Sequence, residues 1–479
     1  MKLQRNIILD TDSYKNDHGR MLPQNTTKMF STIIFRKPNK YAGFTKFLGI
    51  QYFIKEYLLE PITLEMINEA EIEITQQGYV FDRKRWEYII KKHNGFMPLD
   101  IKSVEEGMII PVGVPAVTIE NTDNNCAWLV SYIETSIQRT IWKMTTVASI
   151  SKNLHDYLSE IMFKHEGHKN VDYHLHNFGA RGADSFEVDI MSGISHASGG
   201  FRGSDSLQTN RAIKYYYNTK IPYLSSVIAS EHSVMCANSD PETKDDFKAV
   251  VKMIDLLEEN IENKLGTPIV SIVGDTYDIY RMAEEYIGIR LKHRIMELGA
   301  KGGRVVLRPD SGEPKKICLE VINILMDKFG YSINKNGYKV LPEYIRVLQG
   351  DGINQDSIRE IVCELENNNI SLDNLLFGMG GGLTHEAGRD EFSCSMKATA
   401  IEYNGKWHDL QKDPITDIAK RSPKGRVTTY LNHNKEIYYE RVELKEFNPE
   451  LIDLMSTIYK NGKLLKEYTF EDVLYHNKK

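Results

Sequence analysis

The sequence lacks the features of a disulfide-linked, secreted or membrane-spanning chain. Only five cysteines occur among 479 residues and none forms a C-x-x-C pair, which argues against a disulfide framework and a zinc knuckle. The N-terminal segment MKLQRNIILDTDSYKND has no long apolar stretch with a small-residue cleavage site, so no secretion signal is expected. The most apolar later stretch, residues 128–150, is interrupted by Glu134, Arg139 and Lys143 and predicts a buried helix. We therefore expect a cytoplasmic protein without a membrane span.

An excess of charge of one sign is also missing. Lys and Arg number 60 and Asp and Glu number 66, so the formal net charge is −6. Because the chain has neither a basic stripe nor an acidic tail, we expect no nucleic-acid partner. The composition is that of an ordinary globular protein, with no low-complexity segment.

Several catalytic motifs are absent as well. The chain has no G-x-G-x-x-G dinucleotide fingerprint and no Walker pattern, which disfavours a Rossmann or P-loop enzyme. It has no H-E-x-x-H metal motif and no G-x-S-x-G elbow. His232, which closes the apolar run VIASEHSVM, is therefore not expected to bind a metal or to act in a serine hydrolase.

What the chain does contain, from about residue 170 to 400, is a recurring alternation of a short apolar run, a polar or glycine-rich cluster and a helical stretch. The clusters are NFGARG (177–182), SEHS (230–233), GDTYD (274–278), RPDSGEP (308–314), QGDG (349–352) and GMGGG (378–382). Strands that alternate with helices predict a parallel (β/α) barrel with these clusters at its mouth. A doubly wound open sheet is the alternative, and its crevice also lies at the carboxyl ends of the strands.

The pattern predicts three segments. We expect a mixed α+β domain over residues 1–165, the barrel over 166–399, and a C-terminal segment, 400–479, that packs with the N-terminal domain. Within the barrel, apolar spacing predicts a helix over 314–330 that begins at Pro314 and ends at Gly330, and Ser357 with Glu360 suggests a capping box. Hairpins are expected over 426–442 and over 458–470, where the pair Asn461 and Gly462 favours a tight turn.

The clusters suggest binding of a flat ring and of phosphate. Phe178 beside Arg181 suggests an aromatic ligand stacked on one side chain and oriented by the other, although a lone Phe is more often a core residue. Asp205 is a potential acceptor for an amide. Arg308 and Asp310 place a phosphate-binding cation and a hydroxyl acceptor at one strand end, and Asp351 is an acid at another. Both aspartates suit either the vicinal hydroxyls of a ribose or a hydrated Mg²⁺. Each aspartate alone is explained equally well as a helix N-cap.

Further cations lie toward the C-terminus, and their side chains suffice for a highly phosphorylated ligand. A solvated surface explains any one of the lysines equally well. The glycine run FGMGGGL (377–383), taken alone, is explained by a tight turn between a strand and a helix. These cations are Arg389, Lys397, Lys412, Lys420 and Arg421.

Taken in order, the clusters resemble those of nicotinamide phosphoribosyltransferases. The resemblance is carried by TDSYK (11–15), HNFGARG (176–182), GSDS (203–206), EHS (231–233), DTYDIY (275–280), RPDSGEP (308–314), QGDG (349–352), FGMGGGL (377–383) and KDP (412–414). It implies the irregular α/β barrel of type II phosphoribosyltransferases with a mixed N-terminal domain. It also implies a homodimer with shared active sites and transfer of the 5-phosphoribosyl group from 5-phosphoribosyl 1-pyrophosphate to nicotinamide, yielding nicotinamide mononucleotide in NAD salvage.

The resemblance also implies roles for individual residues. Phe178 and, from the other subunit, Tyr14 sandwich nicotinamide, Arg181 donates to its carbonyl oxygen and Asp205 accepts from its NH₂ group. The residues implied to bind the phosphoribosyl and pyrophosphate groups are Arg36, Arg308, Asp310, Gly350, Asp351, Gly380, Gly381, Arg389, Ser395, Lys397 and Lys412.

By the same resemblance, His232 is the histidine that accepts a phosphoryl group from ATP, a coupling that is facultative in the family. A neutral imidazole oriented by Asp275 suits that nucleophilic role. Asp275 is further implied to lie near a hydrated Mg²⁺, with His232, Asp275 and Asp310 as the catalytic set. Mg²⁺ and ATP are the expected cofactors.

Three positions depart from the common vertebrate pattern, and two other functions stay open. Ala180, Asn177 and Met379 stand where tyrosine, aspartate and serine are usual. Nicotinate phosphoribosyltransferase is the nearest alternative, but Asp205 would repel the carboxylate of nicotinate. A non-catalytic nucleotide-binding protein with the same fold is the other, although the acids and cations of a working site are present.

Overall fold

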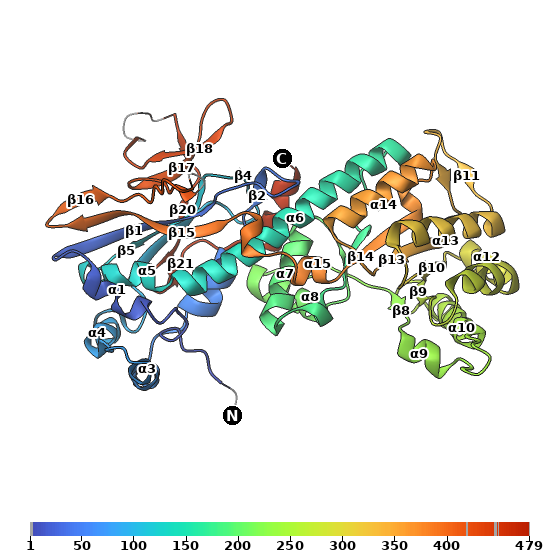
Figure 1. Ribbon diagram of the computed structural model, residues 1–479, viewed down its shortest axis with the longest axis horizontal. Coiled ribbons are helices and arrows are strands. Elements are labelled where there is room, and N and C mark those ends of the chain that lie inside the picture. The colour runs from blue at the N-terminus through green and yellow to red at the C-terminus, as the bar shows by residue number, and fades with distance from the viewer. Residues whose placement is uncertain (1–2, 418–419, 445–447, 449, 479) are drawn as a thin grey trace. The chain divides into compact units, whose positions relative to one another are not determined.

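The computed structural model describes residues 3–417, 420–444, 448 and 450–478, and it contains two compact units (Figure 1). Unit 1 consists of Met1–Ser149, Arg211–Ile221 and Ala387–Lys479, and unit 2 of Ile150–Asn210 and Pro222–Glu386. The long helix α6 (Glu134–Glu166) contributes to both units. The domain boundaries expected at residues 165 and 399 stay predictions.

Unit 2 is built on a curled sheet of seven parallel strands. In sheet order they are β7 (Gly203–Ser204), β6 (Leu175–Asn177), β14 (Leu375–Met379), β13 (Ile345–Gln349), β10 (Arg304–Arg308), β9 (Ile269–Val273) and β8 (Ile228–Ala229). A single parallel bridge between Gly203 and Ser225, three residues before β8, connects the two ends of the sheet. The predicted irregular α/β barrel is confirmed.

Helices between the strands surround this sheet, as the predicted alternation requires. They include α7 (Phe186–Ser198), α9 (His232–Ala237), α10 (Phe247–Asn263), α12 (Lys292–Ala300), α13 (Pro314–Phe329) and α14 (Gln355–Asn367). Helices α10, α12, α13 and α14 lie around strands β9, β10 and β13 in Figure 1.

The ends of α13 follow the prediction, whereas the cap of α14 does not. Pro314 stands at the first turn of α13, and Gly330 ends the helix with φ 78°, a conformation that glycine adopts readily. Helix α14 begins earlier than predicted. Its N-cap is Asn354, and Ser357, which was predicted to be the N-cap, is the third residue of the helix and the second member of the capping box. The prediction was wrong because Asn caps a helix as well as Ser does.

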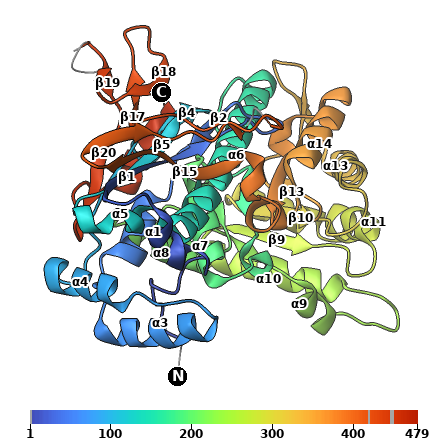
Figure 2. The same ribbon diagram turned by 60° about the vertical axis from the view of Figure 1, so that its left-hand side comes forward.

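Unit 1 is built on a second seven-stranded sheet, in which segments distant in sequence lie side by side (Figure 2). In order, the strands are β16 (Lys406–Asp409), β15 (Cys394–Tyr403), β1 (Thr26–Phe35), β5 (Pro115–Asn121), β3 (Leu99–Ser103), β20 (Ser456–Lys460) and β21 (Lys463–Leu464). Each neighbouring pair is antiparallel. The N- and C-terminal parts of the chain therefore share one sheet.

Short helices and hairpins complete unit 1. The helices include α1 (Lys15–Met21), α3 (Leu64–Gln76), α4 (Arg83–His93) and α5 (Ala127–Tyr132). The expected helix over 128–150 is divided between α5 and α6, and the residues on it are mostly buried. Both expected hairpins form: β17 (Val427–Leu431) pairs with β18 (Ile437–Arg441), and β20 turns into β21 through Asn461 and Gly462, which have φ of 50° and 84°.

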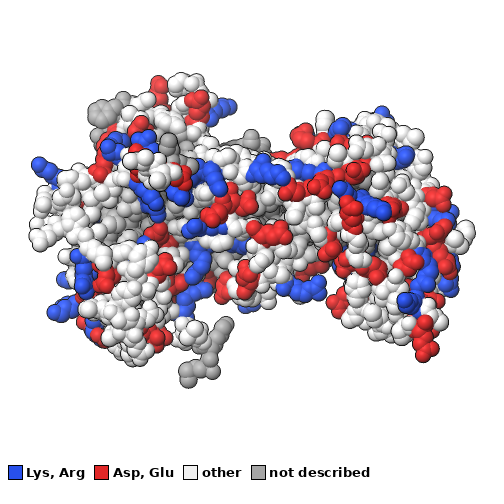
Figure 3. Space-filling model, viewed as in Figure 1, with Lys and Arg blue, Asp and Glu red and all other residues white. Residues whose placement is uncertain are grey.

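The hydropathy of the helices and the distribution of surface charge were also determined. No helix in the described parts of the chain is long and apolar enough to cross a membrane. Positive and negative side chains are interspersed on the face drawn in Figure 3, without a continuous basic stripe on that face.

Candidate functional site

The polar clusters of unit 2 all follow the carboxyl ends of its parallel strands. In sheet order, the ends carry Asp205 after β7, Phe178 and Arg181 after β6, Gly380 and Gly381 after β14, Gly350 and Asp351 after β13, Arg308 and Asp310 at β10, Asp275 after β9 and His232 after β8. Because parallel strands in one sheet point the same way, these residues share one edge of the sheet. The structure thus gathers the eleven site residues predicted for unit 2 at the mouth of the barrel.

Phe178 is held by backbone on both sides. Its N–H donates to the carbonyl of Met379 at 2.9 Å, and its ring lies over Gly350 and Gly378. A Cβ on Gly378 would come within 2.2 Å of the ring, and one on Gly350 within 3.4 Å. The half-buried ring therefore occupies a slot that two residues without side chains provide.

Asp205 is tied to the strand that precedes Phe178. Its N–H donates to the carbonyl of Asn177 at 3.0 Å, and Ser226 Oγ donates to its Oδ1 at 2.5 Å. Among the described residues, Oδ2 accepts no hydrogen bond, and the residue is exposed. An acceptor oxygen is therefore available at the end of β7, the strand next to β6, which Phe178 follows. Arg181 is also exposed, on the single turn η3 (Ala180–Gly182).

Asn177 supports this turn through its side-chain amide. Its Oδ1 accepts the N–H of Gly179 at 2.8 Å, and its Nδ2 lies 3.4 Å from Ser204 Oγ. A Cβ on Gly179 would lie 2.4 Å from Thr384. The amide thus holds the backbone between Phe178 and Arg181.

His232 and two acids form the titratable centre of the barrel mouth. His232 Nε2 lies 2.9 Å from Oδ1 of Asp275, and the histidine side chain is 44% exposed against 12% for the aspartate. One ligand atom of each of His232, Asp275 and Asp310 lies within 4.8 Å of the other two. The imidazole is thus oriented by a mostly buried carboxylate while the ring stays accessible, as a nucleophile or proton carrier requires.

Arg308 is a largely buried cation at the same edge. Its Nε is buried without a hydrogen-bond partner, and lies 3.9 Å from Oδ1 of Asp310. One terminal nitrogen lies 3.4 Å from the carbonyl of Ser230. Such a guanidinium retains donors for an anionic ligand. The neighbouring loop is fixed by Gln349, whose amide donates to the carbonyl of Asp351 at 2.9 Å.

The remaining predicted residues lie in unit 1, where they line one cavity of about 470 Å³. Tyr14, Arg36, Arg389, Ser395, Lys397 and Lys412 all contribute to it, as does Lys420. Tyr14 precedes α1 and Arg36 follows β1. Arg389 begins the single turn η6 (Arg389–Glu391), Ser395 and Lys397 lie on β15, and Lys412 and Lys420 follow β16. Arg139 also lines the cavity, and a cavity with six cationic side chains suits a phosphorylated ligand.

Strand β15 presents two of these side chains from alternate positions. Ser395 is opposite Ile34 and Lys397 opposite Thr32, so both point to the same face of the sheet. Ser395 is 6% exposed, and its Oγ has no hydrogen-bond partner among the described residues. Lys397 Nζ lies 3.6 Å from Oε1 of Glu134. The hydroxyl of Ser395 is therefore free to bond a ligand in the cavity.

Sequence reasoning missed several residues that shape these sites. The amide of Gln138 bridges the backbone of Cys394 and Met396 at 3.1 and 3.2 Å, and Arg139 lines the cavity while pairing with Asp10 at 2.8 Å. Neither shows a local signal, because both act across more than a hundred residues. Ser226 was missed for a similar reason, since it lies in an irregular segment before a very short strand.

The curled parallel sheet with its helices and the separate antiparallel sheet define a protein of the type II phosphoribosyltransferase fold. The structure of nicotinate-nucleotide pyrophosphorylase from Pyrococcus furiosus superposes on it with a TM-score of 0.60, covering 100% of this chain and 96% of that chain at 14% identity, which shows the fold alone. The chain belongs to the nicotinate phosphoribosyltransferase family, whose model matches residues 173–462. A model of the N-terminal domain of nicotinamide phosphoribosyltransferase matches residues 6–101.

Two relatives match nearly the whole chain. A nicotinamide phosphoribosyltransferase of Xanthomonas campestris pv. campestris (strain 8004) is 33% identical over 479 residues and covers 98% of both chains. One of Acinetobacter baylyi is 28% identical over 508 residues, covering 99% of this chain and 97% of the relative.

Proposed function

We propose that the protein transfers the 5-phosphoribosyl group of 5-phosphoribosyl 1-pyrophosphate to nicotinamide, forming nicotinamide mononucleotide and pyrophosphate in NAD salvage. The observation that carries the proposal is the placement of an aromatic ring and an available carboxylate at the ends of two adjacent strands. Phe178 and Asp205 follow adjacent strands, and the hydrogen bond from Asp205 N–H to Asn177 joins the two strand ends. Together they offer a stacking face and an acceptor for an amide NH₂ group.

The carboxylate favours nicotinamide over nicotinate. An ionised Asp205 accepts hydrogen bonds from the amide of nicotinamide, whereas the carboxylate of nicotinate would meet a like charge. Ser226 fixes the carboxylate in place, so it does not turn away easily. The exposed guanidinium of Arg181 supplies the donor for the amide oxygen in this proposal.

The cations and acids serve the ribosyl transfer. The pyridine nitrogen attacks C1 of the ribose while pyrophosphate leaves, and charge develops on both the sugar and the departing anion. Arg308, at the end of β10, is placed to bind phosphate, and Asp310 and Asp351 to accept from ribose hydroxyls. The cations and Ser395 in the cavity of unit 1 are proposed to bind the phosphates of the sugar donor.

Asp275 and Asp310 also fit a hydrated Mg²⁺. Their carboxylates lie close together with His232, and Mg²⁺ prefers oxygen ligands and retains several waters. When bound, the ion would neutralise the charge of the pyrophosphate. His232 itself is not the type of ligand that Mg²⁺ prefers, which leaves the imidazole for another role.

We further propose that His232 accepts the γ-phosphoryl group of ATP. Because Nε2 donates its proton to Asp275, the lone pair on Nδ1 attacks the γ-phosphorus; the bond from that phosphorus to the β-phosphate oxygen breaks, and ADP leaves. Asp275 orients the imidazole through the 2.9 Å contact. The exposed ring supports the proposal, because a phosphoryl donor must reach it.

A homodimer with shared active sites and a cytoplasmic location belong to the same proposal. Tyr14 is 55% exposed at the start of α1, so its ring is available to a ligand bound by another subunit. The proposal is supported by the resemblance of the TDSYK motif, which contains Tyr14, and we propose that this ring and Phe178 of the other subunit enclose nicotinamide.

The direct test uses the purified full chain with nicotinamide, 5-phosphoribosyl 1-pyrophosphate and Mg²⁺, with and without ATP. We expect nicotinamide mononucleotide and pyrophosphate in equal amounts in both conditions, and faster turnover with ATP. Product from nicotinate alone would instead support the nicotinate enzyme, and no product from either base would support a non-catalytic binding protein.

A further inference from the structure

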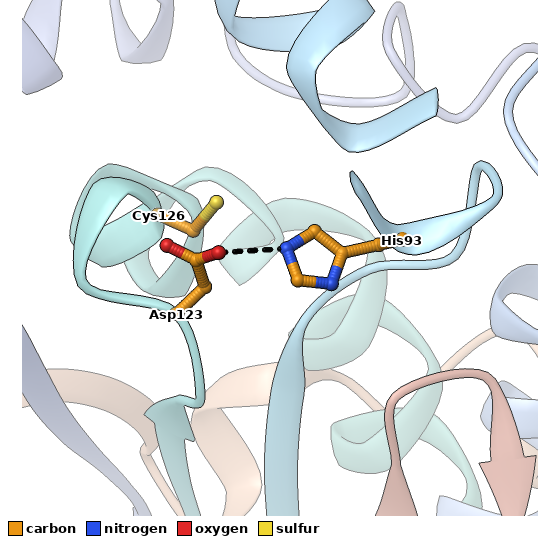
Figure 4. A group of neighbouring side chains, drawn as sticks. All are labelled: His93, Asp123 and Cys126. Carbon is orange, nitrogen blue, oxygen red and sulfur yellow. Dashed lines mark hydrogen bonds and ion pairs between the residues drawn. The ribbon is translucent and has the colours of Figure 1, made fainter. Parts of the chain in front are cut away.

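Three side chains of unit 1, outside all of the predicted site residues, bring metal-binding atoms together at the start of α5. His93 is the last residue of α4, Asp123 precedes the single turn η2 (Asn124–Cys126), and Cys126 ends that turn. One ligand atom of each residue lies within 4.8 Å of the other two. Figure 4 shows the imidazole facing the carboxylate, with the thiol beside the carboxylate.

We propose that His93, Asp123 and Cys126 bind one divalent transition-metal ion of the zinc type. Nitrogen, oxygen and sulfur donors together suit Zn²⁺, whereas a thiolate is a poor ligand for Mg²⁺ or Ca²⁺. The two-residue spacing between Asp123 and Cys126 places two ligands on one turn, and the third comes from 30 residues earlier in the chain. Three protein ligands leave a fourth tetrahedral position for water.

The carboxylate is held in position by groups other than the proposed ligands. Asp123 Oδ1 accepts the N–H of Asn125 at 2.8 Å, and Oδ2 accepts the hydroxyl of Tyr88 at 2.9 Å. Partners of this kind orient the ligands of metal sites and contribute to their affinity.

The two segments that carry the ligands are also fixed to each other. The ring of Trp86 on α4 packs edge-on against Trp128 and Tyr132 of α5, at centroid distances of 4.8 and 5.1 Å. All three rings are buried. The distance between the ligands is therefore set by core packing, while the side chains of His93 and Asp123, 20% and 18% exposed, leave a path for an ion.

Two other interpretations of the cluster are possible on chemical grounds. As a nucleophile, Cys126 is unsuitable, because the residue is 1% exposed and a substrate does not reach its sulfur. As a purely structural contact, Asp123 would cap η2 and bond His93, and Cys126 would only fill space. Metal binding differs from the second interpretation in a measurable way: the thiol loses its proton to solvent, and His93 carries its proton on Nδ1 instead of sharing it with Asp123.

Cobalt provides the readout, because Co²⁺ bound to a thiolate gives a sulfur-to-metal charge-transfer band in the near ultraviolet. The full chain is titrated with Co²⁺ in excess Mg²⁺ and a non-thiol reductant. The group of His232, Asp275 and Asp310 contains no sulfur and cannot produce this band. We expect a band that saturates at one Co²⁺ per chain and disappears when Zn²⁺ is added.

Three variants locate the site. Cys126→Ser is expected to abolish the band. His93→Gln, which retains a donor for Asp123 at a partly exposed position and so protects folding, is expected to weaken Co²⁺ binding at least about tenfold. Cys236→Ser removes an exposed thiol as a control and is expected to change nothing. The absence of a thiolate band in the wild type, a band that persists in Cys126→Ser, or one lost in Cys236→Ser would overturn the proposal.

Discussion

Phe178 and Gly378 fit each other so closely that any side chain on Gly378 would collide with the ring, since a Cβ there would lie 2.2 Å from Cε2. Strand β14 thereby fixes the aromatic face that follows strand β6, its neighbour in the sheet. The position of the proposed nicotinamide site depends on this contact, not on the aromatic residue alone.

Gly378→Ala is therefore expected to displace the ring and to impair nicotinamide binding. Misplacement of a binding group by about 1 Å can cost on the order of a hundredfold in rate, and we expect kcat/KM for nicotinamide to fall by roughly that factor. Gly43→Ala is the matched control, because a Cβ on Gly43 meets nothing within 4 Å. Equal steady-state kinetics for the two variants would contradict the assigned role of the Phe178 slot.

Ser395→Ala tests the phosphate cavity with little risk to folding. Its buried Oγ has no partner among the described residues, so the substitution removes no hydrogen bond there. If the hydroxyl binds a phosphate, its loss costs about 1.5 to 3 kcal/mol, and we expect KM for 5-phosphoribosyl 1-pyrophosphate to rise at least about tenfold. Thr399→Val removes another such hydroxyl from the same strand and lies outside the cavity lining, so its kinetics should match the wild type.

Transfer of label from γ-labelled ATP tests the role of His232. We expect acid-labile incorporation that disappears in His232→Ala and decreases in Asp275→Asn, which no longer presents a carboxylate to the imidazole. His385, another exposed histidine paired with an aspartate, Asp184, at 3.2 Å, provides the control His385→Ala. Label that survives in His232→Ala would refute the assignment.

Shared active sites predict complementation between two inactive variants. Tyr14→Ala and Phe178→Ala are each expected to lose most activity. When they are mixed under conditions that exchange subunits, one site of each mixed dimer regains both rings, so activity should recover in part. A mixture that stays as inactive as its components, although exchange is verified with labelled subunits, would show that each subunit completes its own site.

The stability of unit 1 is expected to fall as the pH rises, because of Glu106. Burial raises the pKa of this fully buried carboxyl from 4.5 to about 7, even though backbone N–H groups of Gly49 and Gln51 and the hydroxyl of Tyr217 donate to it. The folded state therefore holds a proton that the unfolded state releases, and this stabilising contribution is complete below pH 4.5 and lost by about pH 7.

The expected size of this effect is on the order of 3 kcal/mol. Denaturant unfolding at several pH values between 5 and 8 measures it, and the free energy of unfolding is expected to fall by roughly 1 kcal/mol per pH unit up to about pH 7. Glu106→Gln should show a smaller decrease over that range than the wild type, whereas Glu60→Gln, at an exposed position, should follow the wild type. An identical decrease in Glu106→Gln and the wild type would assign the pH dependence to other groups.

Much of the barrel could be predicted from the sequence because its signals are local. Apolar periodicity defined α13, and glycine, aspartate and arginine clusters after short apolar runs marked the strand ends. Parallel geometry then gathers those ends at one edge, whatever the order of the strands. The order β7–β6–β14–β13–β10–β9–β8 itself was not predicted, because pairing between distant strands leaves no local pattern.

Other features depend on contacts between residues that are far apart in the sequence, and such contacts leave no local sequence pattern. The segment Arg211–Ile221 belongs to unit 1, where Tyr217 donates to Glu106, although the residues on either side of it belong to unit 2. The support of Asp205 by Ser226 and of β15 by Gln138 likewise spans loops and long separations. The cap of α14 was misplaced for a different reason, since Asn354 and Ser357 are both good capping residues and only the backbone shows which one begins the helix.

The central claim is that this chain acts on nicotinamide, and the ratio of kcat/KM values for nicotinamide and nicotinate tests it most directly. The wild type is expected to favour nicotinamide by a large factor, and Asp205→Asn, which retains the size of the side chain but not its charge, is expected to narrow that preference. A wild-type enzyme that uses nicotinate as well as or better than nicotinamide would contradict the account.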